Sequence, residues 1–258
     1  RIHILNQPFL SQQLGGFSAG EQLIDYKTVF QLLSSRYKQI YYQLNKHNLL
    51  PVKELFSNKV GFNLKIRNNY ALNLNSYEDL KKNYSQSHKR NINKSLKTGV
   101  QVAPENPATL LNLFKQNQKQ RIKDVKEYHL SVVKSIFLEA EKQKKLLVLI
   151  ARLDHNAVAG IAVIKEYDRM YYLLGASTPE ARNHGAMHLV FDHLIRSHSN
   201  QNLCLDFEGS DAEGIARFFK GFGAECVEYP CISRNNLPLH LSYLIKLKKW
   251  LYSLKRTV

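Results

Sequence analysis

The sequence predicts an α+β protein whose mixed, mainly antiparallel sheet carries helices on both faces. Three short apolar segments, residues 146–153, 157–165 and 169–176, follow one another with linkers of three residues. Such spacing is typical of antiparallel strands joined by hairpins. Helical and extended patterns then alternate at residues 184–198, 203–207, 212–222 and 224–232. This order is typical of folds in which helices pack on a sheet.

The first part of the chain predicts too few strands for a complete sheet domain. Extended patterns occupy residues 1–5, 39–44 and 60–74. Residues 21–34 have helical periodicity, with an apolar stripe formed by Leu23, Tyr26, Phe30 and Leu33. We therefore expect strands and one amphipathic helix before residue 75.

Helices are predicted through the middle of the chain. Ser76 followed by Asp79 has the pattern of a helix start, and Gly99 is suited to end the basic helix that precedes it. Pro107 suits the first turn of a new helix. Helical periodicity then covers residues 107–120 and 126–144, and the second of these has an apolar stripe of Leu130, Val133, Phe137 and Ala140.

Composition limits the class of protein and its partners. The chain has 258 residues, 44% of them hydrophobic, which is enough for a buried core, and no apolar run approaches the roughly 20 residues of a membrane-spanning helix. Three cysteines without a Cys-x-x-Cys spacing argue against a disulfide framework or a zinc site, so we expect a cytoplasmic protein. The net charge of +16 predicts attraction to polyanions such as RNA, nucleotide phosphates or an anionic membrane.

Two loops are expected to meet at one edge of the sheet. The strands at residues 169–176 and 203–207 are joined through a helix, which makes them parallel, and ligands favour the carboxyl ends of such strands. The first loop runs through Arg182, His184, Gly185 and Ala186 into a helix N-terminus, where backbone N–H groups can hold a phosphate. An ordinary tight turn is the alternative interpretation.

The second loop carries two acids. Strand alternation places Asp206 and Glu208 on one face, with Leu205 and Phe207 on the other. Glu208 could remove a proton from an attacking amine, because neighbouring phenylalanines would raise its pKa toward a useful range. The alternative for Asp206 is pairing with an arginine or capping the following helix.

Residues 206–224 resemble a known family. The matching run consists of Asp206-Phe207-Glu208-Gly209-Ser210, Gly214-Ile215, Arg217-Phe218-Phe219-Lys220 and Phe222-Gly223-Ala224, with Tyr229 beyond. This run is similar to the FemAB-type branch of the GNAT superfamily, including the BioF2-like acetyltransferase domains. A second resemblance lies in the basic helix of residues 84–102, and a weaker one at Pro8 with Gln12-Gln13-Leu14-Gly15.

The resemblance implies two GNAT-like domains in tandem, at residues 1–84 and 85–236, with an amphipathic helix at 237–258 packing back on the first. It implies N-acyl transfer from acyl-CoA or aminoacyl-tRNA to an amine of a small molecule or a cell-envelope precursor. It also implies that the pair Phe219-Lys220 contacts the donor, with Lys220 steadying a phosphate or the developing oxyanion. A solvated lysine is the alternative. The predicted mechanism requires no metal and no resident cofactor.

Three further patterns have competing interpretations. His184, His188 and Asp192 have helical spacing suitable for a metal, but we interpret them as the solvent face of an amphipathic helix. Arg90 and Lys94 belong to a basic stripe that suits either solvent or an RNA or pyrophosphate contact. The C-terminal helix, with Trp250 among lysines, could instead lie on an anionic membrane. The rival to an enzyme is therefore a non-catalytic basic module that binds RNA or such a surface.

Overall fold

The computed structural model describes residues 2–18, 24–56, 61–117, 127–209, 211–238 and 240. The chain divides into two compact units: a first unit of Arg1–Arg67 with Glu228–Val258, and a second unit of Asn68–Val227. These boundaries differ from the predicted ones at residues 84 and 236. The physical reason is that two strands of eleven residues, β3 (Asn63–Asn73) and β9 (Glu225–Asn235), each contribute residues to both units.

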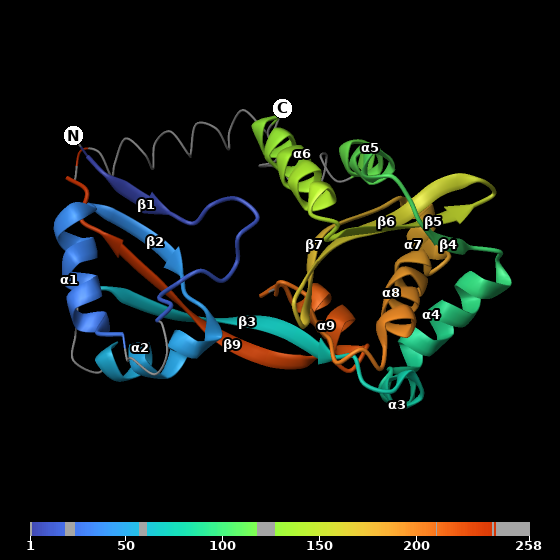
Figure 1. Ribbon diagram of the computed structural model, residues 1–258, viewed down its shortest axis with the longest axis horizontal. Coiled ribbons are helices and arrows are strands. Elements are labelled where there is room, and N and C mark those ends of the chain that lie inside the picture. Colours follow the sequence, from blue (N-terminus) through green and yellow to red (C-terminus); the bar gives the residue numbers. More distant parts are fainter. Residues whose placement is uncertain are drawn as a thin grey trace. The chain divides into compact units, whose positions relative to one another are not determined.

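The first unit contains a small sheet and short helices. Its elements are β1 (Ile4–Asn6), α1 (Tyr26–Arg36), β2 (Gln39–Gln43), a 3-10 turn (Lys46–Asn48) and α2 (Leu49–Phe56). Strand β2 pairs in parallel with β1 and antiparallel with β9 (Figure 1). The apolar core of this unit includes the buried side chains of Tyr26, Phe30, Ile40, Leu44, Val52 and Ile232. Helix α2 was not predicted, because it is short and contains Pro51, which its first turn tolerates.

The second unit contains the predicted meander and alternation. Its further elements are α3 (Tyr77–Asn83), α4 (Gln86–Lys97), β4 (Gln101–Pro104), α5 (Pro107–Asn117), α6 (Glu127–Lys142), β5 (Leu146–Leu153), β6 (Asn156–Glu166), β7 (Arg169–Ser177), α7 (Pro179–Asn183), α8 (Ala186–His198), β8 (Cys204–Asp206) and α9 (Glu213–Lys220). Its strands follow the order β3-β8-β7-β6-β5-β4. Only the β7–β8 pair among these is parallel, as predicted.

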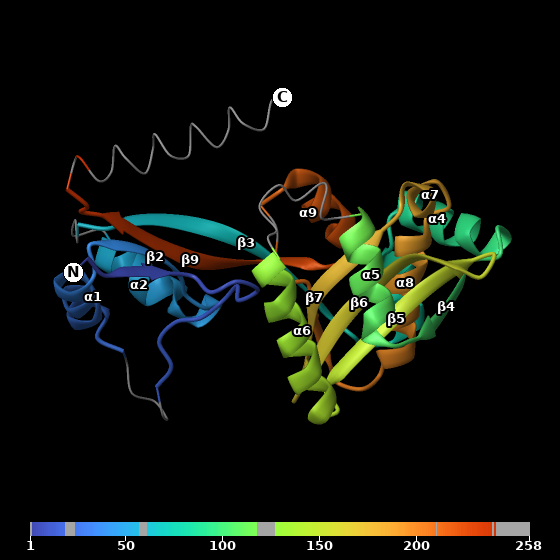
Figure 2. The same ribbon diagram turned by 90° about the horizontal axis from the view of Figure 1, so that it is seen from above.

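Helices cover both faces of this sheet, which confirms the predicted fold class. Helices α5 and α6 lie on one face, and α8 with α4 lies on the other (Figure 2). The core between the layers is apolar and aromatic, with Leu149, Ile161, Phe191 and Leu205 among its most buried members. The predicted helix at 184–198 begins later, at Ala186, because Gly185 adopts a left-handed conformation with φ of +69°.

One expected solvent face is buried, so that interpretation is wrong. Helix α4 packs across α8, and Asp192 of α8 is only 7% exposed. Its carboxylate accepts a hydrogen bond from the Tyr77 hydroxyl at 3.0 Å. Periodicity identified the apolar stripe of α8 but could not show that a second helix covers the polar one.

The expected C-terminal helix falls largely on residues 241–258, which lie outside the described part of the chain. None of the helices in the described part combines the length and the apolar composition needed to cross a bilayer.

Candidate functional site

The parallel strands β7 and β8 diverge at their carboxyl ends. Their pairing ends with Tyr171 opposite Asp206, where β8 also ends, whereas β7 continues to Ser177. Beyond β8 the chain stays with β3, because the Phe207 N–H donates to the Tyr70 carbonyl at 2.9 Å. The edge of β7 from Tyr172 onward is therefore not paired with β8, and residues from both strands can contact a ligand there.

Asp206 fixes the end of β8. Its side chain is buried, and one carboxylate oxygen accepts hydrogen bonds from the Asn69 amide at 2.8 Å and the Glu208 backbone N–H at 2.9 Å. The other oxygen pairs with Arg169 at 3.5 Å. The alternative interpretation, pairing with an arginine, is therefore confirmed. Asn69 escaped prediction because the sequence does not show that β3 flanks β8, and Arg169 because the sequence does not show the register between β7 and β8.

Glu208 is held in an unusual backbone conformation. Its φ is +53° and that of Gly209 is +64°, so two consecutive left-handed residues turn the chain at the end of β8. Burial raises the pKa of the Glu208 carboxyl to about 8, and the nearby Asp206 carboxylate adds to this. Glu208 therefore changes its charge near neutral pH, where a proton acceptor for an amine is useful.

Phe219 and Lys220 have different surroundings although they are adjacent at the end of α9. Phe219 is 3% exposed and stacks on Phe207, with ring centroids 4.4 Å apart. Lys220 is exposed, and its ammonium lies 5.6 Å from the centroid of the Tyr70 ring. Because the Tyr70 backbone bonds Phe207, Tyr70 connects Lys220 to the loop that carries Glu208.

The predicted phosphate loop is tied to α4. A Cβ on Gly185 would lie 2.6 Å from the Asn91 carbonyl oxygen, so the left-handed glycine permits close approach of the two segments. The Ser95 hydroxyl donates to the His184 carbonyl at 2.5 Å. Gly185, the N-cap of α8, has no side chain that could cap the helix, which favours binding of a ligand by the first N–H group, at Ala186.

The basic residues predicted beside this loop are exposed. Arg182 lies in the loop, and Arg90 and Lys94 each precede an α4 residue that contacts it, Asn91 or Ser95. Helix α4 contains no acidic residue. The predicted site residues thus fall into two groups. Asp206, Glu208, Phe219 and Lys220 lie at the end of β8 and on the segment that follows it, and the other group combines the loop after β7 with α4.

His88 joins α4 to α9 and was not predicted. Its Nε2 lies 2.8 Å from the Phe218 carbonyl, which can only accept, so Nε2 carries the proton and Nδ1 accepts from the Ser85 hydroxyl at 2.9 Å. Burial lowers the pKa of His88. Burial, with a contribution from His88, lowers the pKa of the neighbouring His188 to about 4. Both imidazoles are therefore neutral at pH 7.

Tyr172 is a further candidate that sequence patterns did not reveal. It is the first residue of β7 beyond the pairing with β8, and its hydroxyl lies against Gly175, where a Cβ would clash. Burial raises its pKa to about 12. The phenol therefore stays protonated near neutral pH and can donate a hydrogen bond.

Within the described ranges, no three His, Cys, Asp or Glu side chains gather as a metal site. His188 instead packs against the ring of His88, with centroids 4.7 Å apart.

Comparisons with known proteins identify the same part of the chain. Residues 82–220 match a protein family described as Acetyltransferase (GNAT) domain. No curated protein matches the chain by sequence.

Several solved structures share the fold. The crystal structure of FemX is 14% identical, with 86% of this chain and 80% of that chain covered and a TM-score of 0.58. The structure of L-PGS from Bacillus licheniformis is 12% identical, with 86% of this chain and 76% of that chain covered and a TM-score of 0.53. A tandem GNAT protein from the clavulanic acid biosynthesis pathway is 9% identical, with 83% of this chain and 69% of that chain covered and a TM-score of 0.51. At these identities the likeness is one of fold.

Proposed function

Because this chain belongs to the GNAT acetyltransferase family, we propose that its second unit moves an acyl group from a phosphate-bearing thioester or ester to an amine. The reaction would take place at the carboxyl ends of β7 and β8. The observation that carries the proposal is the divergence of these strands beside Glu208, a carboxyl whose pKa burial raises to about 8.

Glu208 is the proposed base. The amine nitrogen attacks the donor carbonyl, the bond from carbonyl carbon to sulfur or oxygen breaks, and Glu208 accepts the proton that the nitrogen loses. A carboxylate with a raised pKa is a stronger base than an ordinary glutamate. Asp206 is a positioning residue, since it binds the Glu208 backbone.

The remaining groups bind and polarise the donor. The first turn of α8 and the exposed Arg182, Arg90 and Lys94 suit its phosphates. Lys220 would stabilise the oxyanion or a phosphate, with Phe219 fixing the end of α9. The Tyr172 hydroxyl is suited to donate a proton to the leaving group, because it lies at the start of the β7 edge not paired with β8.

Donor and acceptor follow from the resemblance of residues 206–224 to FemAB-type proteins. Acyl-CoA and aminoacyl-tRNA both carry phosphates and an activated carbonyl, so both suit the basic loop. An amine on a cell-envelope precursor is the proposed acceptor.

The test is a donor panel assayed with the full chain. Acyl-CoAs and aminoacyl-tRNAs are incubated with amine acceptors, and acyl transfer is followed by mass spectrometry. We expect one donor class to be consumed, and Lys220→Ala to lower turnover by about 10²-fold while the melting temperature stays nearly unchanged. Lys134→Ala, which removes an exposed lysine of α6, is the matched control.

Salt-sensitive binding of donors or anionic vesicles without acyl release would favour the non-catalytic module instead. A Lys220→Ala enzyme with wild-type turnover would remove Lys220 from the site.

A further inference from the structure

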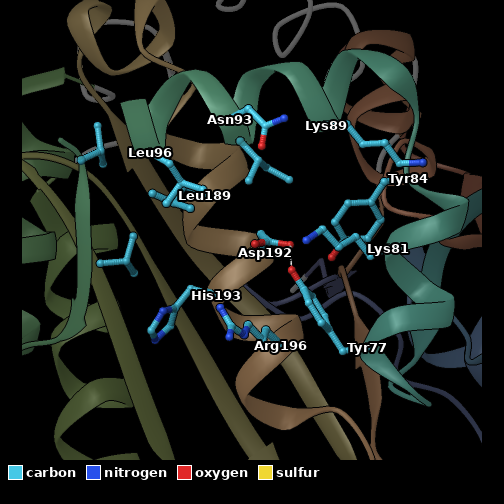
Figure 3. A pocket seen from close by; sticks show the side chains of 13 residues that line it. Tyr77, Lys81, Tyr84, Lys89, Asn93, Leu96, Leu189, Asp192, His193 and Arg196 are labelled. Atoms are coloured by element: carbon cyan, nitrogen blue, oxygen red, sulfur yellow. Dashed lines mark hydrogen bonds between the residues drawn. The ribbon is translucent and has the colours of Figure 1, made fainter. Parts of the chain in front are cut away.

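The second unit contains a pocket away from the proposed transfer site. The cavity has a volume of about 440 Å³ and is lined by residues of α3, α4, β4 and α8 (Figure 3). Its α8 residues run from Leu189 to Arg196. Arg196 is ten residues beyond Ala186, about 15 Å along a helix, so the basic end of the pocket lies far from the phosphate loop, whereas Leu189 lies within one turn of it.

The floor of the pocket is polar and buried. Asp192 is 7% exposed, and its carboxylate accepts a hydrogen bond from Tyr77. Tyr84 is 3% exposed, and burial, together with the interaction of its hydroxyl with the same carboxylate, raises the pKa of Tyr84. Figure 3 shows the hydroxyl ends of Tyr77 and Tyr84 directed toward Asp192. A carboxylate has about four lone-pair sites, so Asp192 can still accept hydrogen bonds from a bound polar group.

The opening of the pocket is basic. Lys81, Lys89 and Arg196 line it, against Asp192 as its one acid. The Lys81 ammonium and the Arg196 guanidinium lie 5.5 and 5.8 Å from the centroid of the Tyr77 ring. No ion pair engages Lys81 or Arg196 in the part of the chain that the structure describes.

The basic opening and the acidic floor of the pocket suit different chemical groups of a ligand. The cations would repel an amine, so the pocket does not suit the proposed acceptor, but they suit a phosphate. A carboxylate beside a hydroxyl suits the hydroxyl groups of a sugar, in the way that acids bind ribose in nucleotide sites. The walls between them are apolar and include Ile92, Leu96 and Leu189.

We infer that the pocket binds a small phosphorylated sugar, with the phosphate at Lys81 and Arg196 and sugar hydroxyls at Asp192 and Tyr84. The volume suits a ligand of this size, since small-molecule sites span roughly 300 to 1,000 Å³. A free sugar phosphate and a nucleoside monophosphate share this chemistry.

Isothermal titration calorimetry on the full chain tests the inference. The probes are ribose 5-phosphate, AMP and UMP, with ribose, adenosine and inorganic phosphate as comparisons. We expect at least one phosphorylated sugar to bind with a Kd below about 1 mM, and its unphosphorylated partner and inorganic phosphate to bind at least about tenfold more weakly. Binding of ribose 5-phosphate as tight as that of AMP indicates the sugar phosphate, and a preference for AMP or UMP indicates the nucleotide.

Variants locate the binding. Lys81→Gln and Arg196→Gln should each raise the Kd about tenfold, whereas Lys134→Gln and Arg182→Gln, in α6 and in the phosphate loop, should leave it unchanged. Tyr84→Phe should weaken binding, because it removes a hydroxyl that lines the pocket beside Asp192 and keeps the ring.

Three results would overturn the inference. They are no binding of any phosphorylated sugar at 10 mM, binding of each phosphorylated sugar no tighter than that of its unphosphorylated partner, and a loss of affinity in Arg182→Gln that matches the loss in Arg196→Gln. The last result would move the ligand to the proposed donor loop.

Discussion

At the scale of single residues, Glu208 combines strain, burial and charge. It follows β8 in a left-handed conformation, and its carboxyl has a pKa of about 8, well above its ordinary value of 4.5, because of burial and the Asp206 carboxylate. A glutamate that resists ionisation lowers the stability of the folded protein where it must ionise. Strongly shifted pKa values are found preferentially at functional sites, which supports a catalytic role for the Glu208 carboxyl.

Glu208 makes stability depend on pH in a predictable direction. Between pH 4.5 and 8 the folded state binds more protons at this residue than the unfolded state does, so its contribution to the free energy of unfolding falls as pH rises. We expect Glu208→Gln to gain stability relative to wild type across this window, by on the order of 2 kcal/mol at pH 8.5. Thermal melts at pH 5 and 8.5 measure this, with Glu225→Gln, an exposed acid of β9, as control. A difference in melting temperature that does not change with pH would contradict the assignment.

At the scale of elements, the aromatic contact of α4, α8 and α9 holds the site together. His88 of α4 bonds the backbone of α9 at Phe218, and His188 of α8 packs against both, with its ring centroid 4.9 Å from that of Phe218. The glycine at 221 leaves room for the His88 ring, because a Cβ there would clash with it. Lys220 lies two residues after Phe218 in the chain, so its position depends on the contact of Phe218 with the two neutral imidazoles.

Acid should therefore loosen these helices. Because the folded-state pKa of His188 is about 4 and its ordinary value is 6.5, the unfolded state binds more protons in between, and stability is lost as pH falls through this range. Between pH 7 and 4.5 the free energy of unfolding of wild type should fall, and we expect this fall to be smaller by roughly 1 to 3 kcal/mol in His188→Gln. Urea unfolding at these two pH values measures it, with His3→Gln, an exposed histidine of the first unit, as control. Identical pH dependence in wild type and His188→Gln would show that this imidazole does not titrate as described.

At the scale of the whole molecule, the features that depend on local sequence patterns were predicted better than the features that depend on tertiary contacts. Residues 146–176 were predicted as a meander because apolar segments and short linkers are local signals, and β5, β6 and β7 confirm it. The four-residue strand β4 was missed because so short a segment has no periodicity. The two-unit boundaries depend on where the long strands β3 and β9 pair, which no local signal specifies.

In the candidate site, too, local sequence signals were sufficient for some features, whereas others depend on tertiary contacts. The parallel pairing of β7 with β8 followed from the intervening helix, and the loops after both strands were predicted from it. The partners Asn69 and Tyr70 come from β3, more than 130 residues before Asp206, so only the folded chain reveals them. The burial of Asp192 under α4 was missed for the same reason.

The most direct measurement is the rate of acyl transfer against pH, from 6 to 9.5, for wild type and Glu208→Gln with the donor that the panel identifies. Transfer at the carboxyl ends of β7 and β8 predicts a wild-type rate that rises with an apparent pKa near 8, and a variant rate at least about 10²-fold lower that lacks this rise. A Glu208→Gln enzyme with the wild-type profile would contradict it, as would the absence of transfer from every donor.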